Sequence, residues 1–122
     1  MKTRQLIAAF AFTIAAAGAF AAGAPVKTMD GALVGAKDMT LYTFDKDADG
    51  KSMCNGPCAT NWPPLMAGAG DTASGDYSII TRDDGGKQWA LKGKPLYYWV
   101  KDAKAGDKTG DGFNNVWHVA KP

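Results

Sequence analysis

The chain has 122 residues, with 14 Lys or Arg side chains, 12 acidic side chains that are all Asp, two Cys and one His. This length provides for one domain, and a hydrophobic share of 46% excludes an intrinsically disordered chain. The net charge of +2 depends on the basic residues Lys2 and Arg4, because the rest of the chain carries equal numbers of basic and acidic side chains. A basic nucleic-acid-binding protein is therefore excluded as the default, and no nucleic-acid partner is expected.

The N-terminal segment has the pattern of a secretory signal peptide. Two basic residues precede an apolar run over residues 6–20, and Ala19-Phe20-Ala21 fits the small-residue pattern before a cleavage site. We predict a signal peptide over residues 1–21 and a mature chain that starts at Ala22. The run is short for a membrane span, so we expect no stable membrane anchor after cleavage. The expected location is the periplasm or the outside of the cell, which excludes a soluble cytoplasmic enzyme.

The mature chain predicts short strands joined by polar turns. Asp, Gly and Pro favour turns, and the Trp, Tyr and β-branched residues favour strands. No segment after residue 25 has a helical period, and Asp83-Asp84-Gly85-Gly86 predicts a hairpin turn. The fold class is thus all-β, a small antiparallel domain. In chain order, the expected strands are residues 32–34, 41–44, 77–81, 88–91, 96–99 and 116–119.

The chain also contains an internal repeat with an offset of 55 residues. The segment 41–47 matches 96–102, and at the same offset Gly31 matches Gly86, Lys37 matches Lys92 and Trp62 matches Trp117. We predict one domain over residues 22–122, built from two tandem repeat units with approximate two-fold internal symmetry. The units cover about residues 26–66 and 81–122, in one register without a gap, and residues 67–75 link them.

The repeat motif combines aromatic residues with an acidic residue. Strand alternation places Tyr42 with Phe44, and Tyr97 with Trp99, on one face of each unit, where they are expected to form core together with Trp62 and Trp117. Asp47 and Asp102 follow these strands and are expected to accept hydrogen bonds from nearby backbone N–H groups. Tyr98 is the best candidate for a surface aromatic ring, because alternation turns it away from its neighbours.

These motifs resemble a family of bacterial secreted repeats, the predicted lipoproteins with a Tyr-x-(Phe/Trp/Tyr)-x-x-Asp motif. The motif occurs as Tyr42-x-Phe44-x-x-Asp47 and as Tyr97-x-Trp99-x-x-Asp102. The string from Cys54 to Leu65 and the string Gly93-Lys94-Pro95-Leu96-Tyr97-Tyr98 also fit the family pattern. The resemblance implies an exported repeat domain and no catalytic mechanism. No Cys follows the signal region here, so we expect no lipid anchor.

Cys54 and Cys58 form a C-x3-C pair, with Gly56 and Pro57 providing a bend between them. This spacing differs from the C-x-x-C of thioredoxin-type proteins, and an exported chain with two Cys favours a structural disulfide. A redox-active pair is the alternative.

Two sets of residues are candidate metal ligands. Asp45, Asp47 and Asp49, followed by Gly50, match the first half of a calcium-binding loop, although Gly56 stands where that loop requires Glu. A copper site would use Met53, Cys54, Cys58 and His118, which bring the sulfur and imidazole ligands that copper prefers. No cofactor is predicted by default, and calcium or copper stays the alternative.

The candidate residues do not form a recognisable catalytic set. The single His has no evident nucleophile, and no G-x-S-x-G turn is present. We therefore expect an exported, non-enzymatic binding or structural module of the cell envelope, whose partner is an envelope protein or a glycan. A periplasmic metal-binding protein and a disulfide redox protein are the alternatives.

Overall fold

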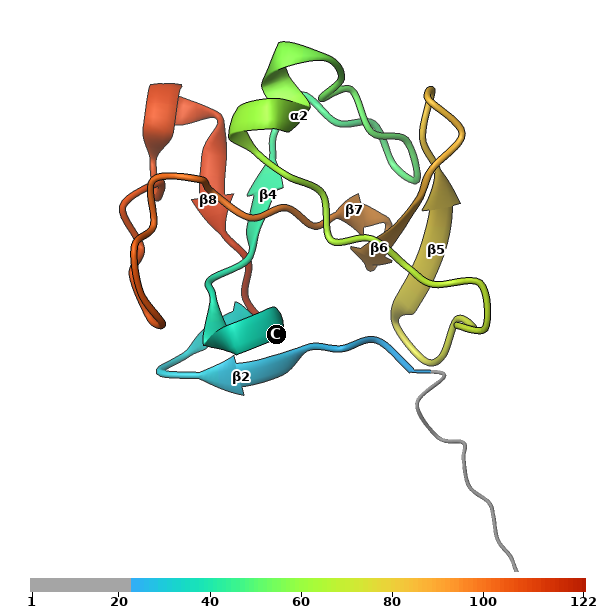
Figure 1. The fold of residues 1–122 in the computed structure, drawn as a ribbon, viewed down its shortest axis with the longest axis horizontal. Helices are drawn as coiled ribbons and strands as arrows, with labels where there is room; N and C mark the ends of the chain where they lie inside the picture. Colours follow the sequence, from blue (N-terminus) through green and yellow to red (C-terminus); the bar gives the residue numbers. More distant parts are fainter. Residues whose placement is uncertain (1–22) are drawn as a thin grey trace, which may run out of the picture.

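The computed structural model describes residues 23–122, so the predicted signal peptide lies outside the described residues. The fold is mainly short strands joined by long connections (Figure 1), and every paired strand is antiparallel. The predicted all-β antiparallel class is confirmed. Among residues 23–122, no helix has the length and apolar character required to cross a bilayer.

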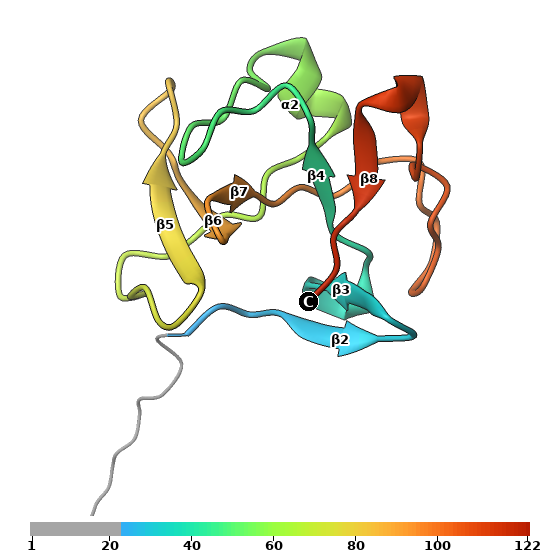
Figure 2. The same cartoon turned by 180° about the vertical axis from the view of Figure 1, so that it is seen from behind.

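Three small sheets make up the domain. β2 (Lys27–Met29) pairs with β3 (Ala32–Val34), and β4 (Tyr42–Phe44) pairs with β8 (Trp117–Val119). The third sheet has the order β5 (Tyr77–Thr81), β6 (Lys87–Leu91) and β7 (Lys94–Pro95). Figures 1 and 2 show β4 and β8 side by side, although they lie far apart in the chain.

The sequence missed the first strand, β2. Its turn, Asp30-Gly31, has both residues at positive φ, 52° and 79°. Both central residues of a type I′ hairpin turn take positive φ, and Asp-Gly is a preferred pair for it. The Asp30-Gly31 dipeptide could therefore have indicated this hairpin from the sequence.

The second aromatic segment, residues 96–99, is extended but does not form the predicted strand. Leu96 N–H donates to the carbonyl of Trp89, Tyr97 exchanges hydrogen bonds with Tyr42, and Tyr98 N–H donates to the carbonyl of Pro63. Consecutive residues thus bond to three different segments. A regular ladder with one neighbouring strand cannot form under these conditions.

Three short helical segments interrupt the strands. The helix α2 (Pro57–Asn61) was not expected, and Pro at its first position is favourable because that residue needs no N–H donor. The 3-10 turns η3 (Ala36–Asp38) and η4 (Phe113–Asn115) lie in loops. Each is too short to show a helical period in the sequence.

The repeat register contains a gap, so the prediction of a gap-free register is wrong. Leu33 N–H donates to the carbonyl of Ala120, and Trp89 N–H donates to the carbonyl of Leu65. Since Leu65 and Ala120 are 55 residues apart, these bonds match Leu33 with Trp89, at an offset of 56. The connection from β3 to β4, which contains η3, is one residue longer than its counterpart.

Alternate residues of the aromatic segments enter two core clusters. Tyr42 and Tyr97 pack with three of the Trp side chains, whereas Leu41 and Leu96 pack with Trp89 in the second cluster. All of these five named side chains are fully buried. The alternation predicted from the sequence thus separates two cores instead of a core from solvent.

Candidate functional site

The repeat motif forms two reciprocal hydrogen bonds between the units. The hydroxyl of Tyr42 donates to Asp102 Oδ2 at 2.7 Å, and the hydroxyl of Tyr97 donates to Asp47 Oδ2 at 2.7 Å. The two Tyr residues also exchange backbone hydrogen bonds of 2.8 and 3.0 Å. Reciprocal contacts of this kind are expected if a two-fold axis relates the units. The two-fold symmetry itself stays a prediction.

The second carboxylate oxygen of each Asp binds its own loop. Asp47 Oδ1 accepts a hydrogen bond from Met53 N–H, and Asp102 Oδ1 accepts bonds from the N–H and the hydroxyl of Thr109. Burial is the main cause that raises the pKa of both Tyr hydroxyls, so they stay protonated donors at neutral pH. Each Asp therefore links a loop of its own unit to the core of the other unit.

Four aromatic rings form a stack in the first core cluster. Their order is Phe44, Trp117, Trp62, Trp99, with neighbouring ring centroids 4.1, 3.8 and 3.9 Å apart. The rings come alternately from the first and the second unit. The three indoles are buried and Phe44 is partly buried, so these motif rings form core, not a free recognition surface.

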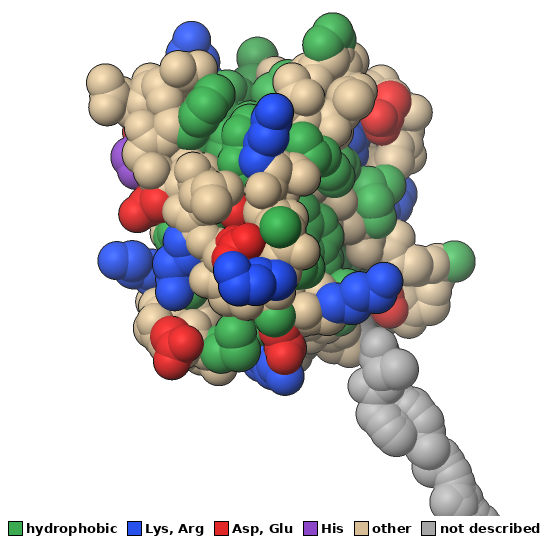
Figure 3. Space-filling view, turned by 60° about the vertical axis from the view of Figure 1, so that its left-hand side comes forward, with side chains coloured by type: hydrophobic (Ala, Val, Ile, Leu, Met, Phe, Trp, Pro, Cys, Tyr) green, Lys and Arg blue, Asp and Glu red, His purple; other side chains and the backbone are tan. Residues whose placement is uncertain are grey.

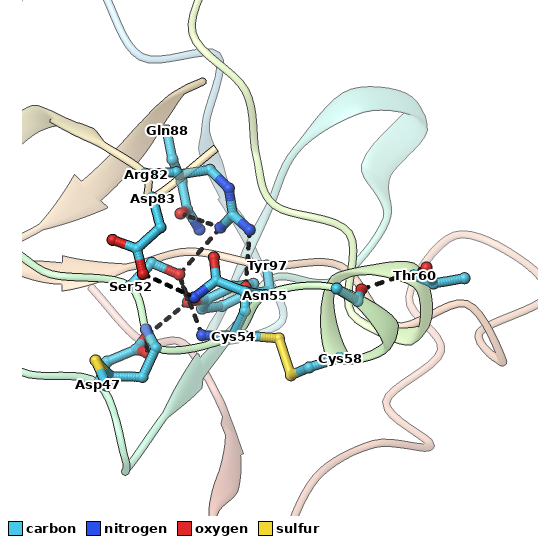
Figure 4. Close-up of a disulfide and its surroundings, with 12 residues drawn as sticks. Asp47, Ser52, Cys54, Asn55, Cys58, Thr60, Arg82, Asp83, Gln88 and Tyr97 are labelled. Carbon is cyan, nitrogen blue, oxygen red and sulfur yellow. Dashed lines mark hydrogen bonds between the residues drawn. A yellow bond between two sulfur atoms is a disulfide. The ribbon is translucent and has the colours of Figure 1, made fainter. Parts of the chain in front are cut away.

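The predicted disulfide joins Cys54 to Cys58 and lies beside a buried polar network (Figure 4). The guanidinium of Arg82 donates to Ser52 Oγ, to Gln88 Oε1 and to the carbonyl of Cys54. Arg82 is 3% exposed, and Cys54 is fully buried. Burial of Cys54 limits attack by other thiols at its sulfur, whereas Cys58 is only partly buried. The buried partner favours a structural disulfide.

The sequence did not single out Arg82, although it is the only Arg after the predicted cleavage site. Arg82 directly follows β5, and strand alternation turns its side chain to the same side as the buried Ile80. This pattern could have indicated from the sequence that Arg82 is buried. The network fixes the Cys54 loop to the β5–β6 hairpin. A buried guanidinium needs such partners, because an unpaired buried charge is costly.

The structure does not bring the predicted calcium ligands together. Asp45 Oδ2 lies 2.7 Å from His118 Nε2, Asp47 bonds to Tyr97 and Met53, and Asp49 lies against Gly93. Within residues 23–122, no group of three His, Cys, Asp or Glu side chains could hold a metal ion.

The predicted copper ligands also make other contacts in the structure. Both Cys sulfurs are used in the disulfide, and the imidazole of His118 faces Asp45. Met53 is 52% exposed beside the disulfide. Thiolate ligation of copper would require reduction of the disulfide first.

Tyr98 is not the free surface ring expected from alternation. Its hydroxyl accepts a hydrogen bond from Ala36 N–H at 2.9 Å, and its ring packs against the second core cluster. The connection that contains η3 covers this face of the segment. A ring at this position therefore joins the second unit to the first.

Two adjoining hollows of about 360 and 340 Å³ lie at the junction of the units. Both are lined by Thr43, Lys92 and Lys94. The first continues along Phe44, Asp45 and residues 47–49, and the second along Leu91 and residues 119–122. Figure 3 shows one face of the molecule, on which basic and acidic side chains are interspersed and hydrophobic side chains gather in its upper part.

Taken together, these contacts define a small all-β module whose two tandem units both contribute to each of the two core clusters. The chain belongs to the family described as a secreted repeat of unknown function, whose model matches residues 24–66 and 78–121. These matches overlap the two predicted units, and the suspected family is confirmed. Comparison with curated proteins and with solved structures finds no match.

Proposed function

We propose that this secreted repeat is a non-enzymatic binding module of the cell envelope, located in the periplasm or outside the cell, whose partner is a protein or a glycan. The observation that carries this proposal is the use of the motif side chains. The Tyr–Asp pairs and the stacked rings contact one another across the two units and are mostly buried. The motif residues thus stabilise the fold, and a partner would bind to residues at the surface of this fold.

The placement of the chemically reactive side chains supports a non-enzymatic role. His118 is hydrogen-bonded to Asp45, an exposed carboxylate that is no nucleophile for it to activate. The two Cys side chains are joined to each other. Within the described part of the chain, these groups form no nucleophile–base pair.

The two hollows beside Thr43 are the surface best suited to a partner. They contain residues of both units, so the arrangement exists only in the assembled domain. Each has a volume near the lower end of the range for small-ligand sites. Apolar floor residues with lysines around them can bind both a ring and a charge.

Site-specific photo-crosslinking in intact cells tests the proposal. A photoreactive amino acid at Thr43 places the probe in both hollows, and one at Thr72, which is exposed and lines neither hollow, is the matched control. We expect a discrete crosslinked product from the Thr43 position only. Mass spectrometry of the purified and digested product then identifies the class of partner, because the peptide that carries the probe is joined either to a second peptide or to sugar residues. No product at Thr43, or the same product at both positions, would contradict the proposal.

A further inference from the structure

The two units place different side chains at one matched position. Thr43 of the first unit corresponds to Tyr98 of the second, at the repeat offset of 55 residues. The surrounding backbone is also matched. Tyr42 pairs with Val119 in β4–β8, and the corresponding residues Tyr97 and Pro64 form an isolated bridge. The two positions can therefore be compared directly.

In the second unit, the ring of Tyr98 fills the space between the units. Its hydroxyl binds Ala36 N–H and lies so close to Gly35 that a Cβ there would come within 2.4 Å of it. The same ring packs against the core cluster that contains Leu65. The Tyr98 ring thus fits closely between its own segment and the turn of the first unit that contains Gly35 and Ala36.

In the first unit, the corresponding space is open because Thr43 is short. The 340 Å³ hollow is lined by Thr43, Leu91 and Lys92. At the offset of 56 that holds for β3 and β6, Leu91 corresponds to Gly35, which lies beside the Tyr98 hydroxyl. Val119 and Ala120, which also line it, correspond to Pro64 and Leu65. The hollow is therefore the counterpart of the place that the Tyr98 ring fills.

The rim of this hollow is positively charged. The exposed side chains of Lys92, Lys94 and Lys121 line it, and within residues 23–122 none of them forms an ion pair. Leu91 and Val119 provide an apolar floor that is almost fully buried. Such a combination favours an apolar ring with negative charge beside it.

We propose that this hollow receives the aromatic side chain of a protein partner, from a segment that also carries acidic residues. The inference rests on the proposed function and selects a protein over a glycan. The ring lies over Leu91 and Val119, as Tyr98 does at the matched position, and the acidic residues pair with the lysines of the rim.

Peptide binding to the full mature chain, followed by amide and methyl NMR shifts, tests the inference. The probes are the capped tripeptides Asp-Tyr-Asp, Asp-Leu-Asp and Ser-Tyr-Ser. We expect saturable shifts at Leu91 and Val119 with Asp-Tyr-Asp, loss of binding with Asp-Leu-Asp, and weaker binding with Ser-Tyr-Ser. Equal binding of Asp-Tyr-Asp and Asp-Leu-Asp, or no binding of either, would overturn the inference.

Two variants locate the binding to this hollow. Thr43→Tyr copies the residue of the second unit and should fill the hollow, with loss of Asp-Tyr-Asp binding and an unchanged fold by circular dichroism. Lys92→Gln should weaken Asp-Tyr-Asp but not Ser-Tyr-Ser, whereas Lys108→Gln, exposed and outside the hollow, should change neither. Undiminished binding to folded Thr43→Tyr would overturn the inference.

The two proposals fail in different ways. A crosslink at Thr43 that joins this protein to sugar residues and to no other protein overturns the aromatic-segment inference and leaves the binding-module function in place. Absence of any crosslink contradicts the function itself.

Discussion

Replacing Tyr42 by Phe removes one oxygen atom that makes two hydrogen bonds to the second unit. The hydroxyl donates to Asp102 Oδ2 at 2.7 Å and accepts from Gly110 N–H at 3.2 Å. A hydrogen bond to a charged group contributes about 1.5–3 kcal/mol, and a buried N–H without a partner costs about 1–3 kcal/mol. Asp102 keeps its two bonds from Thr109, which limits the loss. We expect the free energy of unfolding to fall by about 3 kcal/mol, a large share of the 5–15 kcal/mol typical of a domain.

Urea unfolding at neutral pH, followed by tryptophan fluorescence, measures this loss. Tyr98→Phe is the matched control, since it removes the same atom from a side chain whose hydroxyl accepts one N–H at the surface. A single neutral hydrogen bond contributes about 0.5–1.5 kcal/mol, so the control should lose at most about half as much. Equal losses in the two variants would refute the reasoning.

A double-mutant cycle with Asp102→Asn isolates the Tyr42–Asp102 contact. Residues in direct contact show coupling energies of about 0.5–3 kcal/mol, whereas independent sites add. We expect the double variant to lose less stability than the sum of the single variants. Strict additivity would show that the hydroxyl and the carboxylate do not stabilise the fold through each other.

Three further outcomes follow from other parts of the structure. Gly110→Ala places a Cβ 2.7 Å from one indole ring of the stack and 3.0 Å from another, and we expect a loss of about 1–3 kcal/mol in urea unfolding. Gly70→Ala, which meets nothing within 4 Å, is the control, and equal unfolding midpoints would contradict the packing argument. Cys54→Ala with Cys58→Ala should lower the free energy of unfolding by about 2 kcal/mol in the loop-closure model. If the double variant keeps the near-ultraviolet circular dichroism of the aromatic stack, the disulfide stabilises the fold but is not required for it. Loss of this signal would show that the fold requires the disulfide. Burial raises the pKa of Asp47 above its ordinary 3.8, so the folded state holds this proton more tightly than the unfolded state does. The stability from this group is full below the ordinary pKa and is lost as pH rises through the folded pKa. The stability advantage of the wild type over Asp47→Asn should therefore shrink as pH rises in urea titrations, and an advantage that grows would contradict the assignment.

The fold class and most strands could be predicted because they depend on local patterns. β5 begins and ends where its apolar and β-branched residues do, and the Asp-Asp-Gly-Gly turn follows it as expected. The segment 96–99 shows the limit of this approach. Its alternation is as regular as that of β4, but its backbone partners come from three different segments. Two of these segments lie in the first unit, and no local pattern specifies them.

The same limit explains what was missed at the candidate site. The sequence indicated that Asp47 and Asp102 bind local backbone groups, yet it could not show that each also accepts a Tyr hydroxyl of the other unit, 50 and 60 residues away. Tyr98 was expected at the surface because alternation describes a strand alone, without the η3 connection that covers it. Long-range packing decides these positions.

Because rings of the two units alternate along the aromatic stack, the first unit cannot form the stack by itself. A chain that contained only the first unit would hold Phe44 and Trp62, whose rings touch only through the intervening Trp117. Contacts between residues this far apart in sequence form late and slowly, because the loop between them must close first. The first unit cannot complete its core before Trp117 and Trp99 have been synthesised and delivered to the same compartment. Folding of this secreted repeat is therefore an event that involves both units, and the first half has no complete core until the second half is present.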